Sequence, residues 1–251
     1  MTAVLSAELF KLRTIRGPWV IAFVLVGLSA GAIAMNASLA GDPGQPQLVP
    51  SALAGFARAP GRLLGGAALL LGLLAATTEY RHSTVLTTRL GQPRVPGLLA
   101  GKTAAAVLAG LLLALMVETI MLGGGAILLA SRDLAVEPLR HGLPAALAGI
   151  VVVSALHATI GVAIGELLRN PALAIGAVFG WVFLVEGVLP VVLRAPHLDR
   201  WLPTGAVRSA LSLGQQQADG LLSPAAGLAL LTACAIGLWL AALGRSQLTD
   251  P

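Results

Sequence analysis

Six long apolar segments constrain what this chain of 251 residues can fold into. A helix needs about 20 apolar residues to cross the hydrocarbon core of a bilayer, and every segment except the second is at least that long. We expect the second helix to start earlier, with Arg58 and Arg62 reaching the membrane boundary. The segments predict an all-α polytopic membrane protein with six transmembrane helices, in a single transmembrane domain covering residues 1–251. The predicted spans are 18–40, 63–78, 103–130, 143–165, 172–193 and 221–244.

Composition supports a membrane protein and argues against several other classes. Only 11% of the residues are charged, whereas a soluble domain carries about 25%. The pieces between the spans are too short to hold a soluble catalytic domain. The net charge of +5 comes from scattered residues, without a basic stripe interleaved with aromatics. Membrane lipids are therefore expected as partners, and nucleic acid is not.

Basic residues in the short segments predict the orientation of the spans. Seven of them fall on one side of the first two spans, which predicts that this side and both termini are cytoplasmic. These residues are Lys11, Arg13, Arg16, Arg81, Arg89, Arg94 and Lys102. The first apolar run is long and follows a polar lead, so we expect a retained span and not a cleaved signal peptide.

Two segments outside the spans are expected to form helices of their own. Leu5, Leu9 and Leu12 recur at helical spacing near the N-terminus, which predicts an amphipathic helix in the cytoplasmic interface, although Phe10 lies off this stripe. The segment 194–220 contains Trp201, a residue typical of membrane boundaries. We expect it to form short outer helices before the last span.

Two short motifs resemble catalytic signatures but lack the required context. The stretch ending in Gly101, Lys102 and Thr103 resembles a phosphate-binding loop, yet the position that requires glycine is Pro96 and no strand precedes it. We interpret Lys102 as an anchor at the start of the third span. The sequence GLSAG at 27–31 matches a nucleophile elbow, but it lies inside a predicted transmembrane helix.

Glycine pairs at four-residue spacing favour close packing between helices, since they let another helix approach. These pairs are Gly27/Gly31, Gly161/Gly165 and Gly176/Gly180. An intramembrane hydrolase using Ser29 and His157 is a remote alternative. The four histidines have no metal-ligand spacing, so no metal site is predicted. They are His82, His141, His157 and His197.

Two acidic residues, Glu118 and Glu186, lie inside predicted spans. An acid at the middle of a membrane costs at least about 2.5 kcal/mol on insertion scales, so it usually faces a bundle interior, a cavity or a partner. Both are candidates for lining a translocation path. Packing residues that are protonated or hydrogen-bonded are the alternative, which we favour for Glu186.

Two stretches resemble a known family. The N-terminal lead E-x-x-K-x₇-W, supplied by Glu8, Lys11 and Trp19, resembles the start of a type-2 ABC transporter permease. The segment after the second span resembles the first cytoplasmic loop of that family, with Ser83 where glycine is usual. It supplies, in order, Glu79, Thr84, Val85, Leu86, Pro93, Arg94 and Lys102.

The resemblance implies that this loop forms a coupling helix that docks on a separate ATP-hydrolysing subunit. The residues it assigns to that contact are Glu79, Tyr80, Arg81, His82, Thr84, Arg89 and Arg94. It further implies two ATPase chains, which bind ATP and Mg, and a second permease copy in a homodimer or a related heterodimer. This chain itself is expected to be neither an enzyme nor a cofactor-binding protein.

The resulting interpretation is a permease subunit of an ATP-driven ABC exporter in the bacterial cytoplasmic membrane. Its expected substrate is apolar or amphipathic, such as a drug, an antibiotic, a peptide or a lipid. The alternative is an ion-coupled secondary transporter that uses Glu118, for which no inverted repeat is evident.

Overall fold

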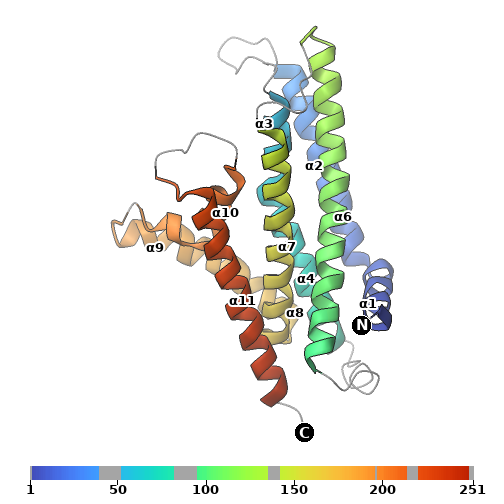
Figure 1. The fold of residues 1–251 in the computed structure, drawn as a ribbon, viewed down its shortest axis with the longest axis vertical. Coiled ribbons are helices and arrows are strands. Elements are labelled where there is room, and N and C mark those ends of the chain that lie inside the picture. Colours follow the sequence, from blue (N-terminus) through green and yellow to red (C-terminus); the bar gives the residue numbers. More distant parts are fainter. Residues whose placement is uncertain are drawn as a thin grey trace.

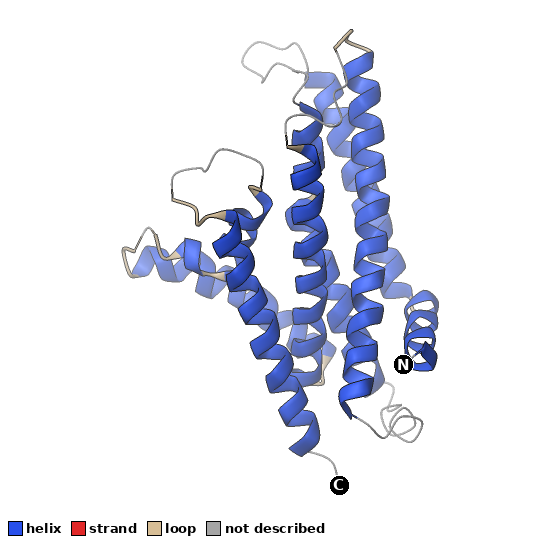
Figure 2. Ribbon diagram, in the orientation of Figure 1, coloured by secondary structure: helices blue, strands red, loops and turns tan. Residues whose placement is uncertain are grey.

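The computed structural model describes residues 2–39, 52–81, 95–134, 142–195, 197–213 and 220–248. Within these ranges the chain is helical and contains no strand (Figure 2). Six helical stretches are long and apolar enough to cross a membrane, which confirms the predicted all-α polytopic fold. They are Arg16–Leu39, Ala52–Tyr80, Val95–Ala130, Leu143–Leu168, Pro171–Val192 and Pro224–Leu248.

The second and third spans start earlier than their predicted boundaries. Two helices, α3 (Ala52–Arg58) and α4 (Gly61–Arg81), together form the second span, which confirms the expected early start. The third span, α6 (Val95–Ala130), begins upstream of the predicted residue 103. Pro96 lies in its first turn, where a missing N–H breaks no intrahelical hydrogen bond, so the proline starts this helix instead of excluding it.

Among the described helices, α4 and α7 (Leu143–Leu168) pack together most extensively. A Cβ atom at Gly161 would collide with the backbone oxygen of Leu69, and one at Gly72 would collide with that of Ala158. A Cβ at Gly165 would lie 2.7 Å from the Cβ of Ala76. The predicted packing role of Gly161 and Gly165 is therefore confirmed, and it operates through direct backbone approach.

The fifth span is not one regular helix. It consists of α8 (Pro171–Gly180), a π-helix η1 (Trp181–Glu186) and α9 (Gly187–Val192), with Pro190 inside the last of these. Figure 1 shows α9 projecting from the side of the bundle. Gly176 and Gly180 face open space within this single chain, as do Gly27 and Gly31 on α2 (Arg16–Leu39).

Short helices precede the last span, as predicted. They are η2 (Asp199–Trp201) and α10 (Pro203–Leu211), and α11 (Pro224–Leu248) follows. Helix α10 packs closely on α11, since a Cβ at Gly227 would lie 2.7 Å from the backbone oxygen of Ala206.

The N-terminal helix α1 (Thr2–Thr14) packs against the first turns of α6. A Cβ at Gly101 would lie 2.5 Å from a methyl carbon of Val4, so the two helices are in close contact there. Helix α1, the C-terminal turns of α4 and α7 and the N-terminal turns of α6 meet at one end of the bundle, which we call the cluster end (Figure 1).

Candidate functional site

A group of charged side chains is buried at the cluster end and forms the candidate site. Four helices contribute to it: α1, α4, α6 and α7. We define the ionic cluster as Glu8, Lys11, Glu79, Tyr80, Lys102 and Glu166.

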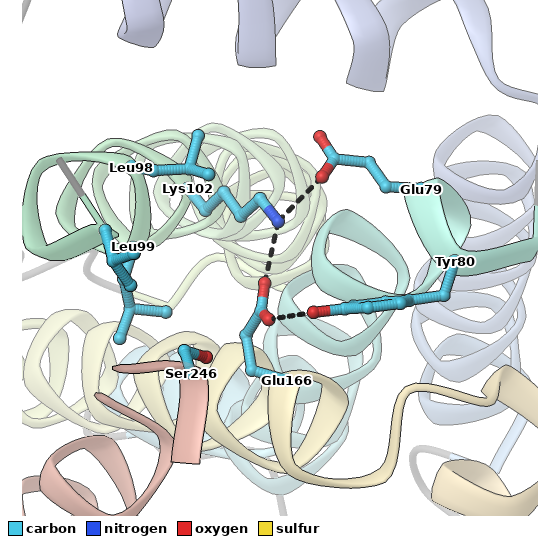
Figure 3. Close-up of a pocket in the computed structure, with 8 residues that line it drawn as sticks. Glu79, Tyr80, Leu98, Leu99, Lys102, Glu166 and Ser246 are labelled. Carbon is cyan, nitrogen blue, oxygen red and sulfur yellow. Dashed lines mark hydrogen bonds and ion pairs between the residues drawn. The ribbon is translucent and has the colours of Figure 1, made fainter. Parts of the chain in front are cut away.

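Lys102 lies at the centre of the ionic cluster and is only 2% exposed. Its ammonium nitrogen is 2.8 Å from Oε2 of Glu79 and 2.7 Å from Oε1 of Glu166. Figure 3 shows the ammonium group between these two carboxylates, which come from α4 and α7. One lysine on α6 thus pairs with two acids on two neighbouring helices. The sequence-based interpretation of Lys102 as an interfacial anchor is replaced by this buried pairing, because both acids lie within reach of its chain.

Lys11 extends the ionic cluster to the N-terminal helix. Its ammonium nitrogen lies 2.9 Å from Oε1 of Glu79 and also pairs with Glu8, three residues earlier on α1. Burial raises the pKa of the Glu8 carboxyl above its usual value, and the Lys11 charge offsets part of that shift. The E-x-x-K part of the N-terminal lead therefore attaches α1 to the end of α4.

Tyr80 connects the end of α4 to α7. Its hydroxyl donates a hydrogen bond of 2.7 Å to Oε2 of Glu166, the oxygen that Lys102 does not bind. The guanidinium carbon of Arg169 lies 5.4 Å from the centre of the tyrosine ring, within the range of a cation–π contact. Both oxygens of Glu166 are thus used, and the last turns of α4 and α7 are fixed relative to each other.

The ionic cluster fixes how four helix ends are arranged, and it does not form a ligand pocket. The cavity beside it, lined by Tyr80, Leu99, Lys102 and Ser246 among others, has a volume of about 20 Å³. That volume suits one water molecule and excludes a nucleotide or a transported substrate. Removing one partner of a buried ion pair costs about 3–5 kcal/mol, because the other charge stays buried. The cluster therefore holds the four helix ends in one geometry.

Two of the residues assigned to the partner contact belong to this cluster. Glu79 is buried with the two lysines, and Tyr80 is bonded to Glu166. Arg81 is the last residue of α4. The remaining four, His82, Thr84, Arg89 and Arg94, lie outside the described residues. In the sequence, the segment 82–94 connects the end of α4 at Arg81 to the start of α6 at Val95.

Glu118 lies in the interior of the bundle, on α6, and is 6% exposed. Within the described ranges, neither of its carboxylate oxygens has a hydrogen-bond or ion-pair partner. Leu113, Val117 and Met121, which flank it along α6, belong to the apolar core. The structure thus leaves this acid without the compensation that Glu79 receives.

Glu186, the other acid inside a span, has a structural partner. Its Oε2 accepts a hydrogen bond of 2.7 Å from the backbone N–H of Thr204 in the first turn of α10. A carboxylate at a helix N-terminus is stabilised by the unsatisfied N–H groups there. Glu186 therefore fixes α10 to the end of η1, in line with the packing role favoured for it.

Sequence reasoning missed Glu166 and the pairing of Lys102. A signal was present, because Glu79, Lys102 and Glu166 each lie at the end of an apolar segment on the same predicted side of the membrane. Two acids and one base at that boundary have a reason to pair. Which of them meet depends on the packing of α4, α6 and α7, which the sequence pattern does not give.

A search of protein-family models and of curated proteins found no match to this chain.

Proposed function

We propose that this chain is the membrane-spanning permease subunit of an ATP-driven exporter of the type-2 ABC class. It moves an apolar or amphipathic substrate, and a separate subunit hydrolyses ATP. The assembly contains two copies of that ATPase and a second permease chain. The observation that carries the proposal is the ionic cluster, which pairs side chains of α1, α4, α6 and α7 near the end of α4 and the start of α6.

The cluster gives a physical basis for transmitting force from a partner. Glu79 lies two residues before the end of α4, and Lys102 lies near the start of α6. A partner that pushes on the segment between them therefore acts on two helix ends that are paired with each other. Lys11 and Glu166 extend this pairing to α1 and α7, so the four helices respond as one body.

The position of Lys102 also supports a separate source of energy. Gly101 and Lys102 lie inside α6, where backbone N–H groups are directed along the helix. A phosphate-binding loop needs those groups turned toward the nucleotide. This supports an assignment of ATP and Mg binding to the partner and not to this chain.

The test is co-purification of the chain with an ATPase subunit of the ABC class. The double variant Arg81→Glu/Arg89→Glu reverses two charges in the proposed contact. We expect recovery of the ATPase to fall about tenfold or more, because like charges facing across an interface cost over a kcal/mol. Membrane insertion should be unchanged.

The matched control reverses two exposed arginines away from the cluster end, Arg62→Glu/Arg194→Glu, and should leave recovery unchanged. Normal ATPase recovery and normal transport-linked hydrolysis in the Arg81/Arg89 variant would contradict the proposal.

A second candidate, an ion-coupled secondary transporter, is favoured by one observation. Glu118 is a buried acid without a partner among the described residues, as a proton-carrying group can be. Transport assays in inverted vesicles separate the two candidates. Vanadate, which blocks ABC ATPases, should stop an exporter, whereas a protonophore should stop a proton-coupled carrier.

A further inference from the structure

The chain bends sharply between α1 and α2, and this elbow carries two arginines. Helix α1 ends at Thr14 and α2 begins at Arg16. The indole N–H of Trp19 donates a hydrogen bond of 2.8 Å to the backbone oxygen of Arg13. That bond closes the elbow from the α2 side and holds the tryptophan ring beside the end of α1.

Helix α1 has two different faces. Glu8 and Leu12 are buried against the bundle, and the ionic cluster fixes that face. On the other face, Phe10 is 68% exposed and Arg13 is exposed as well. This explains why Phe10 lies off the leucine stripe, since it serves a surface that the bundle does not cover.

The elbow has a local excess of positive charge. Arg13 and Arg16 are exposed, and within the described ranges neither guanidinium has a hydrogen-bond or ion-pair partner. The only acidic residue in α1 and α2 is Glu8, which is buried and paired with Lys11. No acid of these two helices therefore neutralises the two arginines.

We propose that the elbow surface, formed by Phe10, Arg13, Arg16 and Trp19, binds the headgroup of an anionic phospholipid. Because α2 is a membrane span that begins at Arg16, the elbow lies at a membrane boundary, where such headgroups are found. A guanidinium can bind a phosphate through two parallel hydrogen bonds. Exposed aromatic rings such as those of Phe10 and Trp19 suit the depth of the headgroups.

The inference rests on the proposed function only for the side of the membrane, which that function makes the cytoplasmic leaflet. Headgroup binding itself needs neither the ATPase nor transport. The lipid would contact the face of α1 that is turned away from the bundle, and the ionic cluster fixes the face that is turned toward it. Helix α1 would then be held on both faces.

The experiment measures lipid binding to the purified full chain in detergent by native mass spectrometry. The probes are dioleoyl phosphatidylglycerol, which is anionic, and dioleoyl phosphatidylcholine, which is zwitterionic. We expect phosphatidylglycerol to bind at least about tenfold more tightly to the unmodified chain, since each arginine near an anionic lipid contributes roughly fivefold. The preference should weaken as salt is raised.

The test variant is Arg13→Gln/Arg16→Gln, which should lose the preference by roughly 10- to 25-fold. The matched control, Arg62→Gln/Arg194→Gln, removes two exposed arginines elsewhere and should keep it. We expect both variants to fold, because none of the four arginine side chains is buried. Their melting temperatures check this.

Either of two results would overturn the proposal. One is equal binding of the two lipids by the unmodified chain, and the other is an unchanged preference in the Arg13→Gln/Arg16→Gln variant. An unchanged preference together with reduced recovery of the ATPase would assign the elbow to the partner protein. If the chain shows no preference for phosphatidylglycerol but still co-purifies with the ATPase, only lipid binding at the elbow is contradicted. If it shows the preference but does not co-purify with the ATPase, lipid binding at the elbow stands and the proposed function is contradicted.

Discussion

Glu79 and Glu118 are both buried acids in membrane-spanning helices, but their surroundings differ. Glu79 is 4% exposed and Glu118 is 6% exposed. Two lysine ammonium groups contact the carboxylate of Glu79, at 2.9 and 2.8 Å. Glu118 has no such contact among the residues that the structure describes. Burial is thus nearly the same at the two positions, and only the partners distinguish them.

The presence or absence of charged partners decides whether a buried acid stabilises the fold or destabilises it. At Glu79 the charge is compensated, and its partners lie on α1 and α6, so its removal leaves other charges uncompensated. At Glu118 an uncompensated polar group costs about 1–3 kcal/mol by protein mutational data. A residue that lowers stability has a reason other than stability to be there, which agrees with a role for Glu118 in transport.

The largest effect is expected for Lys102→Met. This change leaves the carboxylates of Glu79 and Glu166 buried beside each other without their shared cation. We expect it to lower the free energy of unfolding by about 3–5 kcal/mol. The melting temperature of the purified chain in detergent measures this, at about 2–4 °C per kcal/mol for a chain of this size.

Restoring the balance of charge provides the control for Lys102→Met. The double variant Lys102→Met/Glu79→Met removes one acid together with the base, so its loss should be smaller than the sum of the two single losses. If the loss of stability in the double variant equals the sum of the two single losses, Lys102 and Glu79 do not stabilise each other. That result would contradict the view that Glu79 differs from Glu118 by its charged partners.

A matched pair of substitutions tests both acids directly. Methionine is similar in length to glutamate and has no charge. Glu79→Met should destabilise the chain by about 2 kcal/mol, because it leaves Lys102 and Lys11 with fewer partners. Glu118→Met should stabilise it by about 1–2 kcal/mol, because it removes a buried group without a partner. Melting temperatures that shift in the same direction would contradict the comparison.

Transport assays sharpen the interpretation of Glu118. If this acid lines the translocation path, Glu118→Gln should keep the fold and change the transport rate or its dependence on pH. If Glu118→Gln is folded and its transport is unaltered, Glu118 is a packing residue and does not line the path.

The smallest effect is expected for Tyr80→Phe. The change removes one hydrogen bond to Glu166 but leaves the ring and its contact with Arg169 in place. We expect a loss of about 1.5 kcal/mol, at the lower end of the range for hydrogen bonds to charged groups, because Glu166 keeps its contact with Lys102. Phe10→Ala, on the exposed face of α1, is a control that should leave the melting temperature nearly unchanged.

The sequence predicts the spans well because apolar length is a local property. It also identifies Glu118, since a single acid inside an apolar run is visible without a structure. It does not predict the ionic cluster, because Lys102 pairs with residues 23 and 64 positions away, Glu79 and Glu166. Such pairing follows from which helices pack together, and hydropathy carries no information about that.

The fifth span shows a second limit. Its apolar run predicts one continuous helix over 172–193, but the structure contains a π-helix from Trp181 to Glu186 and Pro190 within α9. Proline leaves the carbonyl four residues earlier, that of Glu186, without its usual N–H partner. The π-helix arises from a shift in hydrogen bonding that residue composition does not reveal.

The contact between α4 and α7 limits how these two helices can move relative to each other. The backbone of α7 occupies the space where a side chain at Gly72 would lie, and the backbone of α4 occupies the corresponding space at Gly161. The two helices therefore interdigitate. Sliding one along the other would require them first to separate, which a packed interface resists. The two helices are therefore expected to keep their relative position and to behave as one rigid unit. In the proposed permease, rearrangement is expected in the fifth span, which contains a π-helix and a proline and has the smallest buried share of the six spans described.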